Sequence, residues 1–244
     1  MDGNAVALVT GGSRGIGAAS ALKLAEDGAD VAITYVSDAR AAAEVVGKIE
    51  ALGRRAVAVR ADAADPAAAA TAVEETVREL GGLDVLVNNA GIGVLGPLDT
   101  LAAEDVDRVL AVNVRGVFLT AQAAAGHMRP GGRIITIGTC MTQRVPGPGG
   151  TLYTMSKAAL IGLTKALARE LGERGITANI VHPGPVDTDM NPADGPYAGP
   201  QAAMTAVGRF GTAQEVAAMV GFLAGSQAAF VTGAEFAVDG GHAA

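Results

Sequence analysis

The chain has no tryptophan and only three tyrosines and five phenylalanines among its 244 residues, so small aliphatic side chains must fill its interior. Charged residues make up 18% of the sequence, and its 18 lysines and arginines are outnumbered by 25 aspartates and glutamates. Sequence-independent binding to nucleic-acid phosphates needs a local excess of basic side chains, and the sequence has no such cluster. The composition therefore argues against a nucleic-acid-binding protein.

The sequence also lacks paired cysteines and long apolar runs. Cys140 is the only cysteine and cannot form a disulfide within its own chain, which fits a reducing compartment, and we expect a cytoplasmic protein. No uninterrupted apolar run approaches the roughly 18 residues of a membrane-spanning helix, and the first one starts at Ala5, too early for a secretory signal. The histidines are far apart, and we predict no metal site at His127, His182 or His242.

Short apolar runs alternate with longer alanine-rich segments along the whole chain. The runs are rich in Val and Ile, as is typical of parallel strands covered on both faces. They lie at Ala5–Thr10, Asp30–Val36, Ala56–Ala61, Asp84–Asn89, Arg133–Gly138, Thr177–His182 and Glu235–Val238. Between them, segments such as Ile16–Gly28, Asp38–Gly53 and Pro66–Gly81 are predicted crossover helices. We predict an α/β fold with a doubly wound parallel sheet, as a single domain over residues 1–244.

A glycine-rich turn joins the first predicted strand to the first helix. Glycines at this place let the backbone approach a pyrophosphate closely, and the free N–H groups at the start of the helix attract its negative charge. Such a turn can also serve only as a tight connection, but its strand and helix are the context that a nucleotide site requires. The predicted cofactor contacts in this turn are Gly11, Ser13, Arg14, Gly15, Ile16 and Gly17.

Tyr153 and Lys157 lie four residues apart in a predicted helix that runs to about Glu173. This spacing places both side chains on one face of the helix. A free tyrosine has a pKa of about 10, and a nearby cation lowers it because it favours the phenolate. We therefore predict that Tyr153 acts as a general acid and base and that Lys157 lowers its pKa. Taken alone, the pair is also what an ordinary helix would show.

Several motifs occur together in an order that resembles the short-chain dehydrogenase/reductase family. They are Thr10–Gly17, Asn88-Asn89-Ala90-Gly91, Asn113, Tyr153-x-x-x-Lys157 and Pro183-Gly184, and the similarity continues through Val231–Gly241. Within the family, the sequence looks most similar to 3-oxoacyl-[acyl-carrier-protein] reductases. The resemblance implies a Rossmann-type fold and an NADP-dependent oxidoreductase that reduces a ketone to a secondary alcohol. A 3-oxoacyl thioester of fatty acid or polyketide metabolism is the first candidate substrate.

The resemblance also implies roles for single residues. Tyr153 would exchange a proton with the substrate oxygen, Lys157 would also contact the nicotinamide ribose, and Asn113 would hold a water that connects Lys157 to solvent. Asp62, with Ala63 beside it, would meet the adenine, although an aspartate in this place can also simply cap a turn. The other implied cofactor contacts are Asn89, Ala90 and Gly91 along the cofactor, and Pro183, Gly184, Val186 and Thr188 near the carboxamide.

One position departs from the family pattern. The serine that normally follows the fifth strand and polarises the substrate carbonyl is missing here. Counting from the predicted strand places Thr139 in that position, whereas counting back from Tyr153 places Cys140 there. We favour Thr139, because a strand register slips less easily than a loop and a hydroxyl donates a stronger hydrogen bond than a thiol.

The choice between NADP and NAD depends on the end of the second predicted strand. An NAD enzyme usually has a carboxylate there for the ribose hydroxyls, but this sequence has Tyr35 and, after Val36, Ser37. Arg14 in the glycine turn can pair with a 2′-phosphate, so we expect NADP or NADPH. Asp38 could supply the missing carboxylate if it lay one residue nearer, but its position suits the N-cap of the next helix.

The substrate is left open by the sequence. The proline- and glycine-rich segment at about 189–209 is predicted to be a mobile loop that closes over the substrate. Arg129 and Arg174 resemble carrier-protein contacts but could equally cap helix ends. The alternatives are other small ketones, alcohols or sugars, or a catalytically weak NADP-sensing protein. The apolar segment Phe230–Gly241 and the small-residue helix Ala158–Leu171 lead us to expect a homotetramer.

Overall fold

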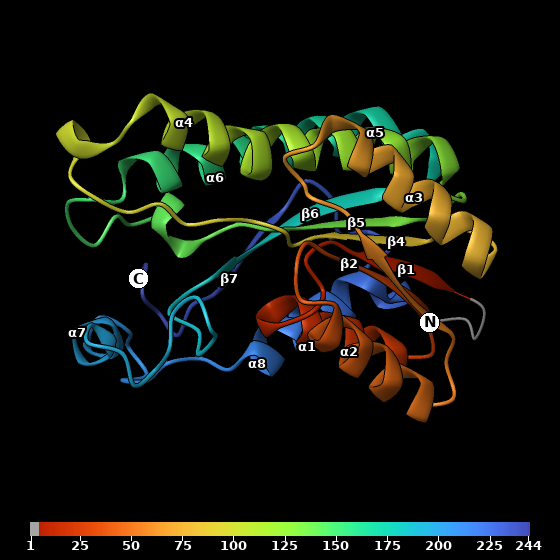
Figure 1. Ribbon diagram of the computed structural model, residues 1–244, viewed down its shortest axis with the longest axis horizontal. Helices are drawn as coiled ribbons and strands as arrows, with labels where there is room; N and C mark the ends of the chain where they lie inside the picture. Colours follow the sequence, from red (N-terminus) through yellow and green to blue (C-terminus); the bar gives the residue numbers. More distant parts are fainter. Residues whose placement is uncertain (1–4) are drawn as a thin grey trace.

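A seven-stranded parallel sheet forms the centre of the molecule, in a computed structural model that describes residues 5–244 (Figure 1). The strand order is β3-β2-β1-β4-β5-β6-β7, and all neighbours are parallel. The strands are β1 (Val6–Val9), β2 (Asp30–Tyr35), β3 (Ala56–Arg60), β4 (Val85–Asn88), β5 (Arg133–Ile137), β6 (Thr177–Pro183) and β7 (Glu235–Val238). Each lies within about one residue of its predicted run, and the predicted doubly wound fold is confirmed.

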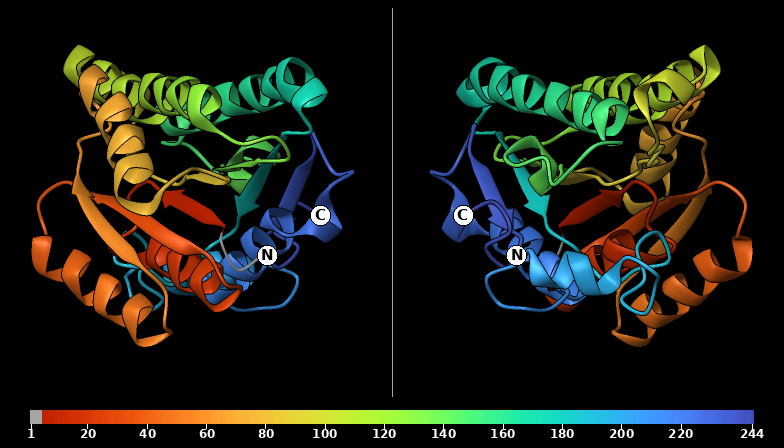
Figure 2. Two further views of the ribbon diagram at one scale, coloured as in Figure 1. Left: turned by 90° about the vertical axis from the view of Figure 1, so that its right-hand side faces the viewer. Right: turned by 90° about the vertical axis from the view of Figure 1, so that its left-hand side faces the viewer.

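Helices cover both faces of this sheet (Figures 1 and 2). One face carries α1 (Gly15–Glu26), α2 (Ala39–Ala51) and α8 (Ala213–Ala224). The other carries α3 (Pro66–Leu80), α4 (Ala103–Leu110), α5 (Val117–His127) and α6 (Thr151–Leu171). Neighbouring side chains of a strand point to opposite faces, so Val9 belongs to the core beneath α1 and α8, whereas Leu8 belongs to the core beneath α3 and α5.

Local sequence signals explain where several helices begin and end. Asp38 caps α2 by accepting a hydrogen bond from the N–H of Ala41 at 2.9 Å. Pro66 opens α3 after Asp65, and Gly81 ends it in the left-handed conformation that favours glycine. Asp38 thus has the capping role that the sequence favoured for it.

One helical stretch of the described chain, Ala103–His127, has the length and the mean hydropathy of a membrane-crossing helix. It contains α4, α5 and the π-helical turn Ala111–Gly116 between them. Its buried side chains, among them Ala121 and Ala124, pack in the core over the sheet. The stretch is apolar because it packs over the sheet in the core of the protein.

The segment at 189–209 differs from the prediction of a loop without secondary structure. It contains α7 (Ala198–Ala203), a helix of six residues, and a short bridge between Thr188 and Asn191. The segment lies at the same end of the sheet as the loops that follow the strands, at the left of Figure 1. Its hydrogen bonds include a pair between the side-chain amides of Asn191 and Gln201, at 2.9 and 3.0 Å.

Candidate active site

The predicted site residues gather where the carboxyl ends of β1, β4, β5 and β6 meet. The chain passes from β1 outward to β3 and then returns to place β4 on the other side of β1, so the strand order reverses between β1 and β4. In doubly wound sheets, ligands bind in the crevice at such a reversal. The other predicted cofactor contacts lie at the carboxyl ends of β1, β2, β3, β4 and β6, in the turns that follow, or at the start of α1: Ser13, Ile16, Tyr35, Ser37, Asp62, Ala63, Ala90, Pro183, Gly184 and Val186.

The glycine turn after β1 can hold a pyrophosphate only because its glycines lack side chains. Gly11 and Gly15 have φ angles of +63° and +53°, which other residues rarely adopt. A Cβ on Gly17 would collide with the carbonyl oxygen of Gly11. A Cβ on Gly15 would lie 3.3 Å from the Thr188 side chain, so the segment after β6 comes over this turn.

Asn89 fixes this turn to the end of β4. Its Nδ2 donates to the carbonyl oxygens of Thr10 and Gly11, both at 3.0 Å, and the Thr10 hydroxyl accepts from the backbone N–H of Asn89 and Ala90. The side chain of Asn89 therefore satisfies backbone groups. The turn is prearranged by the protein itself.

Asn113 connects the loop after β4 to α6. Its Oδ1 accepts from the N–H of Ile92 at 2.9 Å, and its Nδ2 donates to the carbonyl of Ile92 and to Ser156 Oγ at 2.9 and 3.0 Å. Both amide hydrogens are in use, so a water bound to this side chain would have to use the second lone pair of Oδ1. A Cβ on Gly91 would come within 3.3 Å of Oδ1. The role of Asn113 as the holder of a water stays a prediction.

Lys157 is only 4% exposed, and its ammonium donates to the carbonyl oxygen of Ile137, at the end of β5, at 2.9 Å. Burial lowers the pKa of Lys157 to about 8. The ammonium also faces the backbone after β4, because a Cβ on Gly91 would lie 3.2 Å from Nζ. Lys157 thus occupies the floor of the crevice between β4 and β5.

Tyr153 lies on the same helix one turn earlier and beside Thr139. Burial raises the pKa of Tyr153, and a hydrogen bond with the Thr139 side chain opposes this rise. Burial is the largest cause of this shift, and the Lys157 ammonium bonds to Ile137, so the lowering of the Tyr153 pKa by Lys157 stays a prediction. The phenol is therefore firmly protonated at neutral pH.

Thr139 follows β5 after Gly138 and caps the short 3₁₀ turn Cys140–Thr142. Its Oγ1 accepts from the N–H of Met141 at 3.4 Å, and its side chain lies close enough to the phenol of Tyr153 to oppose the rise of the Tyr153 pKa. Cys140 is buried, and burial raises the pKa of its thiol to about 11, so the thiol is a weak donor and is not ionised near neutral pH. The geometry favours Thr139 over Cys140 as the partner of the phenol.

Two arginines could pair with a 2′-phosphate: Arg14 in the glycine turn, which the sequence indicated, and Arg60 beside the end of β2, which it did not. Arg14 is exposed, with its guanidinium 3.8 Å from Asp189. Arg60 ends β3, pairs in register with Tyr35, and donates Nε to the carbonyl of Val36 at 3.1 Å. Arg60 could have been found in the sequence, because it lies at the end of the predicted strand that follows β2 in the chain. Asp62, in the following turn, caps the N–H of Ala64 at 2.9 Å, as the plainer of its two predicted roles requires.

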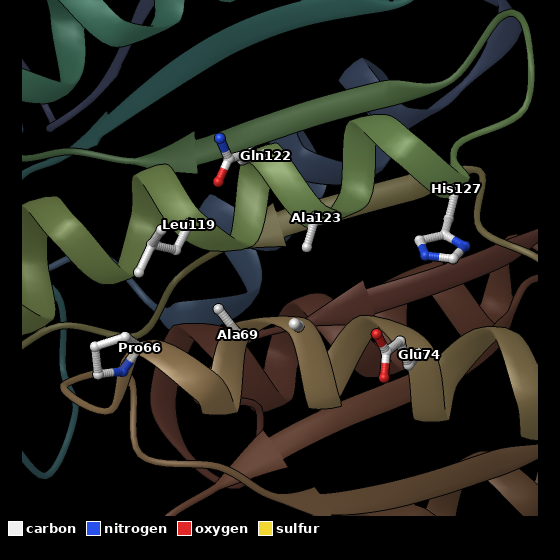
Figure 3. Close-up of a pocket in the computed structure, with 8 residues that line it drawn as sticks. Pro66, Ala69, Glu74, Leu119, Gln122, Ala123 and His127 are labelled. Carbon is white, nitrogen blue, oxygen red and sulfur yellow. The ribbon is translucent and has the colours of Figure 1, made fainter.

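A separate groove of about 340 Å³ lies far from these residues in the fold (Figure 3). Its lining comes from α3 and α5, with Glu74 and His127 among the residues that border it. The catalytic candidates instead follow β4 and β5 or lie on α6. The groove therefore borders none of the predicted site residues.

Comparisons with known proteins identify the relatives of this chain. A family model described as Enoyl-(Acyl carrier protein) reductase matches residues 11–243. The Cyclic-di-GMP-binding biofilm dispersal mediator protein of Escherichia coli is 45% identical over 96% of this chain and 94% of its own. Versicolorin reductase 1 of Aspergillus parasiticus is 41% identical, and the match covers 99% of this chain and 97% of that protein. A short chain dehydrogenase from Burkholderia cenocepacia, whose crystal structure was solved in complex with NADP, is 56% identical in sequence. The match covers 99% of this chain and 98% of that chain, with a TM-score of 0.98.

Proposed function

Because the chain belongs to the short-chain dehydrogenase/reductase family, an NAD(P)-dependent group of oxidoreductases, we propose that it uses NADPH to reduce a ketone to a secondary alcohol. The observation that carries this proposal is the placement of Thr139, Tyr153 and Lys157 around one crevice beside the glycine turn. When bound there, NADPH supplies a hydride for the carbonyl carbon. The glycines of the turn fit it, because a side chain at Gly17 would collide with the carbonyl oxygen of Gly11 and displace the turn that meets the pyrophosphate.

The chain's own residues supply the proton and the orientation. The Thr139 hydroxyl is placed to donate a hydrogen bond to the substrate carbonyl oxygen and to hold it beside the phenol. Tyr153 then gives its proton to the same oxygen as negative charge develops there. Lys157 and the backbone after β4 close the floor of the crevice.

The raised pKa of Tyr153 favours reduction over oxidation. Reduction needs a protonated phenol, and burial keeps it protonated at neutral pH. An alkoxide is a much stronger base than a phenolate, so it takes the proton even from a phenol with a raised pKa. Oxidation of an alcohol would instead need the phenolate, which this environment disfavours.

Three features support NADPH over NADH. Asp38 is used as the cap of α2, Arg60 brings a guanidinium group to the end of β2, and Arg14 lies in the glycine turn, exposed and 3.8 Å from Asp189. Guanidinium groups bind phosphates by charge-assisted hydrogen bonds. The relative from Burkholderia cenocepacia, crystallised with NADP, supports the same choice.

Replacing Arg14 and Arg60 together with alanine is expected to raise KM for NADPH by about 100- to 10,000-fold, since each of the two charged hydrogen bonds contributes roughly 1.5–3 kcal/mol. KM for NADH, which has no 2′-phosphate, should change much less. Steady-state rates with each cofactor give the ratio of KM for NADPH to KM for NADH. Arg78→Ala, which removes an exposed arginine on α3, is the matched control. An equal rise of KM for both cofactors would contradict the assignment.

The substrate entrance is apolar, which favours a ketone with an apolar or aromatic body. Leu95, Val145, Met190 and Tyr197 are exposed on the loops after β4, β5 and β6. These loops meet, because Gly96 donates its N–H to the carbonyl of Gly149 at 2.9 Å and the space at Gly93 borders Met190. The relative named versicolorin reductase supports a polycyclic substrate of this kind.

The carrier-protein contacts suggested by the sequence receive less support. Arg174 donates to the carbonyls of Ala125 and Met128, both at 2.7 Å, at the end of α5, and Arg129 pairs with Asp84 at 2.9 Å. Both arginines precede strands and lie at the opposite end of the sheet from the crevice. A 3-oxoacyl thioester therefore serves as a comparison substrate. We expect aryl and polycyclic ketones to give the higher kcat/KM when NADPH consumption is followed with both substrate classes.

Thr139→Val is expected to lower kcat about 100-fold, because it removes the hydroxyl donor but keeps the shape of the side chain. Thr139→Ser keeps the donor and should retain most of the activity. Both variants should bind NADPH, which fluorescence titration can check. Full activity in Thr139→Val would remove this residue from the site.

A nucleotide-sensing role is the second candidate, favoured by the E. coli relative named for binding cyclic di-GMP. It differs from the enzyme in one measurable respect. A sensor would bind NADPH tightly but would not consume it, whichever class of ketone is added. The complete set of Thr139, Tyr153 and Lys157 supports the enzyme.

Two separate apolar faces support a homotetramer. Phe118 and Met155 are half exposed on α5 and α6, and Phe222 on α8 and Phe230 are exposed on the other side of the sheet. Two different self-complementary faces are what a tetramer with crossed two-fold axes needs. Light scattering at micromolar protein should give the mass of four chains, and a monomer would contradict this.

A further inference from the structure

His182 lies inside the sheet, one layer below the candidate active site. It is on β6, it has no exposed surface, and its Nδ1 accepts a hydrogen bond from the backbone N–H of Thr139 at 3.3 Å. On its other side, Nε2 lies 3.3 Å from Oε2 of Glu235 on β7. Glu235 is held in turn by Lys165 of α6, with Nζ 2.8 Å from Oε1.

The contacts of His182 fix which ring nitrogen carries the proton. An N–H always donates, so Nδ1 must offer its lone pair to Thr139. The Thr142 hydroxyl lies 3.4 Å from Nδ1, but it donates to the carbonyl of Thr139 at 2.9 Å. The proton is therefore on Nε2 and is donated to Glu235. The imidazole is neutral and serves as an acceptor aimed at one backbone group.

The backbone beside Thr139 is shaped to receive this ring. A Cβ at position 138 would lie 2.5 Å from Nδ1 of His182, so only glycine lets the imidazole come this close to β5. Burial lowers the pKa of His182, opposed by Glu235 and reinforced by Lys157, the two charged groups that act on it. The ring therefore keeps its neutral, accepting form at neutral pH.

We propose that His182 is a positioning residue for the reaction: by accepting the N–H of Thr139 and being held by Glu235, it sets the orientation of the Thr139 hydroxyl toward Tyr153. The proposal rests on the proposed carbonyl reduction, in which that hydroxyl holds the substrate oxygen. The network runs from the helix that carries Tyr153, through Lys165 and Glu235, back to the residue that faces Tyr153. Small displacements of such a group lower catalytic rates strongly.

His182→Leu removes the acceptor but fills a similar volume, and we expect kcat to fall about 10- to 100-fold with little change in KM for NADPH. His182→Asn places an amide oxygen where Nδ1 stood and should restore most of the activity. Thermal unfolding shows whether each variant is folded. Gly138→Ala, which pushes the ring away, should resemble His182→Leu.

A double-mutant cycle separates positioning from a general loss of stability. If His182 acts through Thr139, His182→Leu should have little further effect on kcat in a Thr139→Val background. An undiminished effect in that background, or full activity of His182→Leu alone, would overturn the proposal.

A readout that does not depend on catalysis distinguishes this proposal from the proposed function. Amide hydrogen exchange of the Thr139 N–H should become faster in His182→Leu and stay slow in His182→Asn. If the wild-type protein reduces no ketone, the proposed function fails while this exchange pattern still reports the contact. Unchanged exchange in His182→Leu would overturn the positioning role.

Discussion

Replacing Tyr153 with phenylalanine is expected to reduce kcat for ketone reduction about 1,000-fold, within the range known for a lost general acid. The substitution keeps the ring and removes only the proton that the substrate oxygen receives. Tyr153 is half-buried against Thr139, so water has little access as a substitute donor. Stopped-flow measurement of NADPH consumption gives the rate, and fluorescence titration shows whether NADPH still binds.

Thr71→Val is a matched control for this experiment, since it also removes one hydroxyl but lies on the exposed side of α3. Its rate should equal that of the wild type. A Tyr153→Phe variant that reduces ketones as fast as the control would show that the proton comes from elsewhere.

Lys157→Met is expected to change how the stability of the protein depends on pH. The pKa of Lys157 falls from 10.5 to about 8 in the folded protein because of burial. Between these values the unfolded chain binds more protons than the folded one, so the free energy of unfolding rises with pH. Between about pH 8 and pH 9.5, the free energy of unfolding should rise by roughly 2 kcal/mol more in the wild type than in Lys157→Met.

Urea denaturation of both proteins at several pH values measures this difference. The comparison removes the contribution of other titrating groups, because only one side chain changes. A parallel pH dependence of the two proteins would mean that Lys157 is not buried as an ionisable group. Unfolding curves that agree with the prediction would show that the Lys157 ammonium is buried in the folded protein.

The strands could be predicted from the sequence because each is a short apolar run that is covered on both faces. Leu8 and Val9 show this directly, since neighbouring residues belong to opposite cores. The helix α7 was missed because Gly199 and Pro200 interrupt its six residues, which are too short for a periodic pattern. Fold class thus follows from pattern, but short helices in irregular segments do not.

The candidate site could be predicted only in part. The spacing of Tyr153 and Lys157 correctly placed both on one helix, but it could not show that the ammonium bonds to the carbonyl of Ile137. The contact between His182 and Thr139 joins a residue of β6 to the turn after β5, and isolated histidines look like packing residues in a sequence. Such contacts follow from the strand order, which brings β5, β6 and β7 side by side.

The most direct test of the central claim is to follow the hydride itself. NADPH carrying deuterium at the reactive position is incubated with the wild-type protein and an aryl ketone, and the product is examined by NMR. We predict one secondary alcohol per NADPH consumed, with deuterium on the carbinol carbon and a rate that falls about 1,000-fold in Tyr153→Phe. Tight NADPH binding without any labelled alcohol from either class of ketone would contradict the account.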